Sequence, residues 1–557
     1  MRNLLFLVLV IVSLGTVLGC GEKIPPEPGV TARELVGAEK VAGLPLTDEE
    51  RALMLDDLAG NLEGFQSIRA LKLTNDVRPA LCFDPELVTG PPVDLSERPS
   101  TWSDPGAVAM PENPDDLAFY TVAQLGALIR TRQISCEELA RFSLDRFARF
   151  DPQLLCTVTL LEERALTRAR ELDDLLDAGQ YLGPLHGIPY GAKDLLAVAG
   201  APTTWGAEPY RDQVLDQTAT LVTRLDQAGA VLVAKLTLGA LAWGDVWFGG
   251  MTRNPWNLEQ GSSGSSAGSA SAVAAGLVPF AIGTETLGSI VSPSTRCGTT
   301  GLRPTFGRVS KAGAMALSWS MDKIGPITRA AEDCGLVLDV IRGADPADPT
   351  SVDRPFSYAP EVDWSRLRIA YLADDFDEDY PGRDLDAAAL QVLRNLGAQL
   401  VPLELPLQER GLDPYAISTV LSVEAAAAFQ ELTLSGRDDL LTRQVRYAWP
   451  NVFRGAYFVP AVEYVQANRA RVQLMQMMAE VFDEFDLYVT PSLYSSSLTI
   501  TNLTGHPQVV MPAGFLEANA PHSISLVGDL YDEATLLAVA RAYQEATGWD
   551  ESHPEGF

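Results

Sequence analysis

Three residues of this chain could together carry out serine-based hydrolysis: Lys193, Ser265 and Ser289. Ser265 lies in the Gly/Ser run GSSGSSAGSAS, and Ser289 follows a second glycine step, TLGS. A serine hydroxyl needs a base to become a nucleophile at neutral pH. A lysine can be that base only when its amine is neutral, and burial in a low-dielectric site lowers the pKa of an amine. Lys193 lies in GIPYGAKDLLAV, a largely apolar segment, so it is predicted to be buried.

Burial alone does not make Lys193 catalytic. A buried lysine is either functional or paired with a carboxylate, and Asp194 or Glu285 could be that partner. A second lysine, Lys235, lies in the apolar segment VLVAKLTL, and we interpret it as structural. The other serines of the Gly/Ser run are predicted to form turns and helix caps; they are Ser262, Ser263, Ser266 and Ser269.

Two other kinds of site are disfavoured by the residue pattern. The Gly/Ser run lacks the lysine that a phosphate-binding GxxxxGK[ST] loop requires. The histidines show no i, i+4 pair and no HExxH motif, so no metal site is predicted; they are His186, His506, His522 and His553. The cysteines other than Cys20 show no metal-ligand spacing and are interpreted as small buried hydrophobes; they are Cys82, Cys136, Cys156, Cys297 and Cys334.

A Ser-His-Asp hydrolase or esterase is one alternative. Residues 264–268, GSSAG, match the GxSxG motif of a nucleophile elbow. That elbow requires a strand directly before the serine, whereas the preceding segment MTRNPWNLEQG is rich in turn formers. It also requires a later histidine, which His506 or His522 could supply.

The elements that must position these residues follow an α/β pattern from about residue 115. Capping boxes at Thr121 and Ser135 predict helix starts, and apolar runs such as residues 231–234 predict buried strands of a largely parallel sheet. We expect one domain over residues 115–545, followed by a tail over 546–557. Residues 20–114 are predicted to form a tether and an N-terminal extension. Within the extension, residues 47–73 are predicted to be helical and residues 75–113 to wrap over a larger body.

The first twenty residues are typical of an export signal. Arg2 precedes an apolar stretch over residues 4–12, which is shorter than the roughly 20 residues of a membrane-spanning helix. VLGC resembles a bacterial lipobox, which implies that residues 1–19 are a lipoprotein signal peptide and that Cys20 carries the lipid. We therefore expect an exported protein, lipid-anchored to the cell envelope in the outer membrane and periplasm or at the cell surface. The formal net charge of −31 argues against nucleic acid as a partner and against membrane contact other than through the anchor.

Three motifs together resemble those of the amidase signature family: GIPYGAKD, GSSGSSAGSASAVAAGLVPFAIGTETLGSI and CGTTGLRPTFGRVS. The resemblance covers residues 115–545. It implies a large mixed, mostly parallel sheet with helices on both faces, and chemistry without metal or cofactor. Carried over position by position, Lys193 is the base, Ser265 is a relay serine on a cis peptide bond, and Ser289 is the nucleophile. The oxyanion would be held by the backbone N–H groups of Thr286, Leu287, Gly288 and Ser289.

Three positions depart from the motif of the family. Leu287 stands where the family has glycine, and a positive φ would strain a leucine there. Glu285 replaces the usual aspartate, and Val291 replaces the usual arginine two positions after the nucleophile. The charge pair that is normally formed there must be absent or rebuilt, with Arg296 as a candidate replacement.

The resemblance implies an amidase that hydrolyses a small-molecule carboxamide through a Ser-Ser-Lys triad and an acyl-enzyme. Two alternatives share the signature: the glutaminase component of a tRNA-dependent amidotransferase, and an inactive binding homologue. The export signal argues against the first, and only Leu287 and Val291 favour the second. A homodimer is left open. Aromatic residues within 410–480 could line the pocket or pack in the core; they are Tyr447, Trp449, Phe453, Tyr457 and Phe458.

Overall fold

The structure is a computed structural model that describes residues 31–44, 46–91 and 95–557. The predicted lipoprotein signal, with Cys20, lies outside the described residues. The chain divides into two units, Met1–Leu73 and Thr74–Phe557. In the first unit, helices α1 (Ala32–Ala42) and α2 (Asp48–Arg69) contact each other, and a capping box of Thr47 and Glu50 begins α2 within the segment 47–73 that was predicted to be helical.

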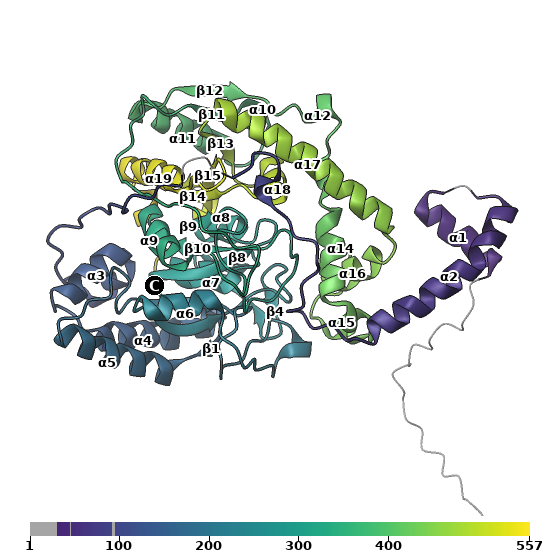
Figure 1. The fold of residues 1–557 in the computed structure, drawn as a ribbon. Helices are drawn as coiled ribbons and strands as arrows, with labels where there is room; N and C mark the ends of the chain where they lie inside the picture. Colours follow the sequence, from purple (N-terminus) through teal and green to yellow (C-terminus); the bar gives the residue numbers. More distant parts are fainter. Residues whose placement is uncertain (1–30, 45, 92–94) are drawn as a thin grey trace, which may run out of the picture. The chain divides into compact units, whose positions relative to one another are not determined.

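In the described part of the chain, the second unit is built on an eleven-stranded sheet with the strand order β1-β3-β2-β8-β10-β9-β14-β15-β13-β11-β12 (Figure 1). The strands are β1 (Thr157–Leu160), β2 (Pro189–Lys193), β3 (Val231–Leu236), β8 (Phe280–Glu285), β9 (Thr300–Arg303), β10 (Lys323–Thr328), β11 (Ile369–Leu372), β12 (Leu400–Leu403), β13 (Leu487–Pro491), β14 (Gln508–Phe515) and β15 (Pro521–Gly528). Two small two-stranded sheets join β4 (Val246–Trp247) to β5 (Gly250–Met251), and β6 (Arg253–Asn254) to β7 (Asn257–Gly261).

The predicted large mixed sheet is confirmed, and its parallel pairings lie in two blocks. Strands β3, β2 and β8 are parallel, and so are β13, β11 and β12. Between the blocks, β8, β10, β9, β14, β15 and β13 pair antiparallel, as does β1 with β3 at the edge. The expectation of a mostly parallel sheet therefore describes the two blocks, while the middle of the sheet is antiparallel.

Helices cover both faces of the sheet, as predicted. Every residue of β2, β3, β9, β10, β13 and β15 is buried, which requires protein on each side of these strands. Two helix pairs, α7 with α8 and α9 with α19, pack on the central strands. The helices are α3 (Val122–Arg130), α4 (Cys136–Leu154), α5 (Glu162–Asp177), α6 (Thr220–Gln227), α7 (Ala267–Ala274), α8 (Val291–Cys297), α9 (Ala331–Ile341), α10 (Ala373–Asp377), α11 (Arg383–Leu396), α12 (Leu407–Arg410), α13 (Pro414–Ile417), α14 (Thr419–Ala428), α15 (Gln430–Leu434), α16 (Trp449–Ala456), α17 (Ala461–Glu484), α18 (Ser497–Thr504) and α19 (Glu533–Thr547).

Local sequence signals account for several helix starts. The Thr121 hydroxyl accepts from the backbone N–H of Gln124 at 3.1 Å where α3 begins, and the Ser135 hydroxyl accepts from that of Glu138 at 3.0 Å where α4 begins. Such caps satisfy backbone donors that the first turn of a helix leaves unpaired. None of the helices in the described ranges combines the length and the apolar character needed to cross a membrane. The cysteines described by the structure are free thiols.

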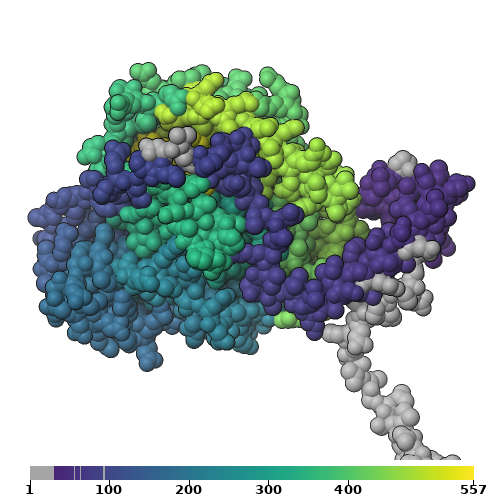
Figure 2. Space-filling model, in the orientation of Figure 1, coloured from purple at the N-terminus to yellow at the C-terminus, as the bar shows by residue number. Residues whose placement is uncertain are grey.

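The described residues between 74 and 113 form the predicted extended wrap. They lie across the surface of the second unit, to which they belong (Figure 2). The ring of Phe83 packs edge-on against Phe306 at 5.0 Å, and the ring of Trp102 stacks on Tyr358 at 4.8 Å. Aromatic pairs of this kind add to hydrogen bonds such as that from the Thr101 N–H to the Tyr358 carbonyl oxygen at 2.8 Å, and together they hold the segment in place.

Candidate active site

Lys193 is the last residue of β2, and its side chain is fully buried. Its Nζ lies 2.8 Å from the hydroxyl oxygen of Ser265, 3.0 Å from that of Ser266 and 2.8 Å from that of Thr284. The Thr284 carbonyl oxygen is 3.3 Å away. These four oxygens all belong to uncharged groups. A neutral amine at this position can accept the hydroxyl proton of Ser265 through its lone pair.

The two carboxylates that could have paired with Lys193 are engaged elsewhere. Asp194 pairs with Lys235 at 2.6 Å, and Glu285 pairs with Arg303 at 2.8 Å. Burial is the dominant influence on Lys193, and it lowers the pKa of its amine well below the ordinary value, although Asp322 and Glu285 oppose the shift. The geometry therefore favours the catalytic interpretation of Lys193 over the structural one.

Ser265 is held next to Lys193 by tight backbone packing. The Gly264–Ser265 peptide bond is cis, as the resemblance implied. A Cβ atom at Gly264 would lie 1.9 Å from the carbonyl oxygen of Gly244, so only glycine fits there. The backbone N–H of Ser266 donates to the carbonyl oxygen of Ser289 at 3.1 Å, which joins the Gly/Ser run to the segment of the predicted nucleophile.

Two residues of the site were missed by the sequence analysis, Ser266 and Thr284. Ser266 was expected to act as a turn former or cap, but it makes no side-chain cap to α7. Its hydroxyl oxygen lies 3.0 Å from the Nζ of Lys193, and the hydroxyl also donates to the Thr284 carbonyl oxygen at 3.1 Å. Because the strand residue Thr284 reaches this cluster from β8, only the pairing of β8 with β2 reveals it.

Ser289 lies in the turn between β8 and α8. It is 8% exposed, and its hydroxyl makes no hydrogen bond within the described part of the chain. Of the two side-chain contacts that the expected relay needs, the structure contains the one between Lys193 and Ser265. The hydroxyl of Ser289 is not engaged by another side chain of the described residues. Gly288 takes the left-handed conformation with a φ of 78°, whereas Leu287 does not. The strain that a positive φ would have caused at Leu287 is therefore absent, because the turn needs glycine at position 288 only.

Glu285 braces the turn that carries the predicted oxyanion hole. Its carboxylate accepts from the backbone N–H groups of Ile290 and Val291 at 2.7 and 3.0 Å. Burial alone would raise the pKa of this carboxyl, but the Arg303 guanidinium and the hydrogen bonds lower it to about 2. The candidate replacement Arg296 does not rebuild the missing charge pair. Arg296 contacts Gln260 at 3.2 Å on the surface, and Arg303 of β9 takes the role because it is buried opposite Glu285.

A second carboxylate, Asp322, ties the same turn to a neighbouring loop. The hydroxyl of Thr286 donates to Asp322 at 2.6 Å. The other carboxylate oxygen of Asp322 accepts from the backbone N–H groups of Leu317 and Ser318 at 2.8 and 3.0 Å. The position of the turn therefore depends on the loop of residues 311–322, which we call the cavity loop.

Replacing Lys235 by methionine is expected to lower the free energy of unfolding by about 3–5 kcal/mol, because the variant leaves the buried carboxylate of Asp194 without its cation. Both side chains of the pair are fully buried. Urea denaturation followed by circular dichroism measures the loss. The matched control is Lys193→Met, which removes a buried amine that pairs with no carboxylate in the described part of the chain and should cost far less. Equal losses from the two variants would contradict the assignment of separate roles.

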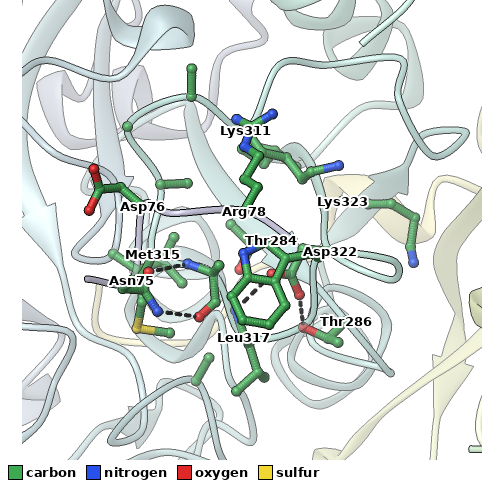
Figure 3. Close-up of a pocket in the computed structure, with 18 of the residues that line it drawn as sticks. Asn75, Asp76, Arg78, Thr284, Thr286, Lys311, Met315, Leu317, Asp322 and Lys323 are labelled. Carbon is green, nitrogen blue, oxygen red and sulfur yellow. Dashed lines mark hydrogen bonds between the residues drawn. The ribbon is translucent and has the colours of Figure 1, made fainter. Parts of the chain in front are cut away.

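A cavity of about 230 Å³ reaches the site from the side of Thr284 and Thr286. Its wall includes residues 311–317 of the cavity loop, Trp319 and Asp322. Figure 3 shows Asp322 hydrogen-bonded to Thr286 within this wall. The cavity therefore shares residues with the Lys193 cluster and with the predicted oxyanion turn.

The histidines needed for a Ser-His-Asp site make their hydrogen bonds elsewhere. His506 is paired with the hydroxyl of Thr504 at 2.8 Å, and burial lowers its pKa to about 3. His522 is paired with Asp386 at 2.8 Å. Neither histidine bonds to Ser265 or Ser289, so the geometry gives no support to this alternative.

The aromatic residues of the 410–480 segment do not line this cavity. Trp449 and Phe453 stack on each other at 5.2 Å and are buried in the core. Tyr447 and Phe458 are exposed at the surface, by 69% and 67%. Of the two fates considered for these aromatics, core packing holds for Trp449 and Phe453, which lie on the buried side of α16, and none of the named residues lines the cavity described here.

Comparisons with known proteins agree with this architecture. A protein-family model described as Amidase matches residues 138–501. The chain is 33% identical over 491 residues to a glutamyl-tRNA(Gln) amidotransferase subunit from Geobacillus thermodenitrificans, and 35% identical over 489 residues to the protein of the same name from Halorhodospira halophila. Each match covers 78% of this chain and 99% of the relative.

Solved structures give the same result. The peptide amidase of Stenotrophomonas maltophilia is 29% identical with a TM-score of 0.67, over 78% of this chain and 98% of that one. A bacterial aryl acylamidase, described as an amidase signature enzyme, superposes with a TM-score of 0.69 over 78% of this chain and 97% of that one, and at 24% identity it supports the fold alone. Fold, motifs and comparisons define the class: the chain belongs to the amidase signature family.

Proposed function

We propose that this protein hydrolyses a carboxamide to a carboxylate and ammonia or an amine, through a Ser-Ser-Lys triad of Lys193, Ser265 and Ser289. The observation that carries the proposal is the environment of Lys193. A fully buried lysine that has no carboxylate partner among the described residues, and a serine hydroxyl 2.8 Å away, is suited to accept a proton near neutral pH.

In the proposed mechanism, Lys193 accepts the proton of the Ser265 hydroxyl, and Ser265 accepts that of Ser289. The Ser289 oxygen then bonds to the amide carbon, and the carbonyl electron pair moves onto oxygen. Backbone N–H groups of the turn 286–289 hold this oxyanion, and one such donor typically contributes about 2.7–4 kcal/mol. The C–N bond breaks as the proton returns through Ser265 to the leaving nitrogen. Water attacks the acyl-enzyme in the same way and releases the carboxylic acid.

A fluorophosphonate probe tests the nucleophile directly, because it forms a covalent bond only with an activated serine. Mass spectrometry of the labelled protein should locate the adduct on Ser289. A panel of primary aliphatic amides, peptide amides and aryl amides, assayed for ammonia or amine release, then identifies the substrate class. A protein that is neither labelled nor active on the panel would be the inactive binding homologue instead.

A second candidate function is that of an amidotransferase component. It is favoured by the relatives from Geobacillus and Halorhodospira, which carry that name at 33% and 35% identity. Such a component would act on glutamine and depend on partner proteins. This function would be excluded if the isolated chain hydrolyses amides and its rate does not change when tRNA, glutamine and amidotransferase partner proteins are added.

We also propose that the protein is exported and anchored to the cell envelope by a lipid on Cys20. The sequence VLGC at residues 17–20 supports this proposal. Several acyl chains on one residue hold a protein on a bilayer, because each buried CH₂ contributes about 0.8 kcal/mol. Cells fed an alkyne-tagged palmitate should label the wild-type protein, and Cys20→Ala should abolish both labelling and membrane fractionation. A labelled Cys20→Ala variant would contradict the assignment.

A further inference from the structure

The N-terminal extension supplies one side of the cavity beside the active site. Asn75, Asp76 and Arg78 are among the lining residues, and we call them the N-terminal wall. Figure 3 shows Asn75 hydrogen-bonded to the cavity loop. The side-chain amide of Asn75 donates to the carbonyl oxygen of Ala316 at 2.8 Å, and its oxygen accepts from the Ala316 N–H at 2.7 Å. A single side chain therefore satisfies both backbone groups of a residue in the cavity loop.

A second contact holds the other end of the same loop. Arg78 pairs with the buried carboxylate of Asp348 at 2.5 Å. The second oxygen of Asp348 accepts from the backbone N–H of Lys311 at 2.7 Å, where the cavity loop begins. Asn75 and Arg78 thus fix the loop at two points.

The cavity loop is in turn joined to the catalytic turn. Asp322, at its end, accepts from the Thr286 hydroxyl at 2.6 Å and from two backbone N–H groups of the loop. A change in the N-terminal wall can therefore alter both the width of the cavity and the setting of the turn 286–289.

The wall lies outside the part of the chain that the family model matches. The relatives are matched over 99% of their own length but over only 78% of this chain, and the family model begins at residue 138. Residues 75–78 precede that start. A segment that precedes the family-model region and lines the cavity is in a position to give this protein its own substrate preference.

We propose that Asn75 is a specificity-determining residue: by clamping the cavity loop it restricts the site to amides that carry a compact group beside the scissile bond. The inference rests on the proposed amidase function. It agrees with the size of the cavity, since about 230 Å³ is below the roughly 300–1,000 Å³ of pockets that hold drug-sized ligands.

The test compares the rates at which two fluorophosphonates of different size label Ser289, an ethyl-substituted and a naphthyl-substituted probe. In the full-length protein, Asn75→Ala removes both hydrogen bonds to the loop and is expected to raise the naphthyl-to-ethyl rate ratio. The expected rise is about fivefold, which corresponds to the net contribution of one typical hydrogen bond. Asn75→Asp keeps the acceptor but loses the donor, and should shift the ratio in the same direction. Thermal melts show that each variant is folded.

Ser100→Ala is the matched control. Ser100 also anchors the extension, since its hydroxyl accepts from the backbone N–H of Tyr358 at 3.2 Å, but it does not line the cavity. Its rate ratio should equal that of the wild type. An unchanged ratio in both folded Asn75 variants, or an equal shift in Ser100→Ala, would overturn the inference while leaving the amidase function intact. If neither probe labels the wild type, the proposed function fails and this inference fails with it.

Discussion

Replacing Lys193 by methionine is expected to lower kcat for amide hydrolysis by about four orders of magnitude, the upper range for loss of a general base. Methionine keeps the apolar stem of lysine but cannot accept the proton of Ser265, whose oxygen lies 2.8 Å from Nζ. Steady-state assays on an amide found in the panel measure the loss. Wild-type activity in purified Lys193→Met at neutral pH would remove the mechanism.

The burial of Lys193 also predicts how the rate and the free energy of unfolding depend on pH. Burial lowers the pKa of Lys193, so the wild-type rate should fall as the pH decreases through that lowered value and the amine becomes protonated. The effect on stability has a definite sign. Between the lowered pKa of the folded state and the ordinary value of about 10.4, the unfolded state binds more protons than the folded state. The burial of Lys193 therefore lowers the free energy of unfolding in this range, and that free energy increases again as the pH rises. Lys193→Met should remove this contribution to the slope of unfolding free energy against pH.

If Ser289 is the nucleophile as proposed, replacing it by alanine is expected to lower kcat by about six orders of magnitude, as removal of the nucleophile does in a serine protease. No acyl-enzyme can form without its oxygen, and fluorophosphonate labelling should disappear together with turnover. The fold should be retained, because the hydroxyl of Ser289 makes no hydrogen bond within the described residues. A thermal melt checks this point.

Ser265→Ala distinguishes the relay from the nucleophile. It leaves Ser289 in place but removes the hydroxyl between Ser289 and Lys193. Labelling should become slower and yet remain on Ser289. A Ser265→Ala protein that is labelled at the wild-type rate would show that Ser265 is no part of the relay, and an adduct on Ser265 in the wild type would exchange the two roles.

Several features of this protein could be predicted from the sequence alone because they are local. The GIPYGAKD and Gly/Ser motifs identify Lys193, Ser265 and Ser289, since each motif encodes its own turn or strand end. The capping boxes at Thr121 and Ser135 mark helix starts because donor and acceptor are three residues apart. The alternation of helices and apolar strands predicts the α/β class for the same reason.

The tertiary structure decided which groups meet across the sheet and between distant segments. It assigned Arg303, and not Arg296, to Glu285, because strand order places β9 and β8 on either side of β10. It brought Thr284 to Lys193 through the pairing of β8 with β2. It also joined Asn75 to Ala316, which lie 241 residues apart. Contacts of this kind depend on strand order and on packing, and no short-range pattern in the chain specifies them. The motifs therefore lead to Lys193, Ser265 and Ser289 as the proposed catalytic residues. The fold determined that Lys193 has no carboxylate partner among the described residues and that the extension forms a wall of the cavity.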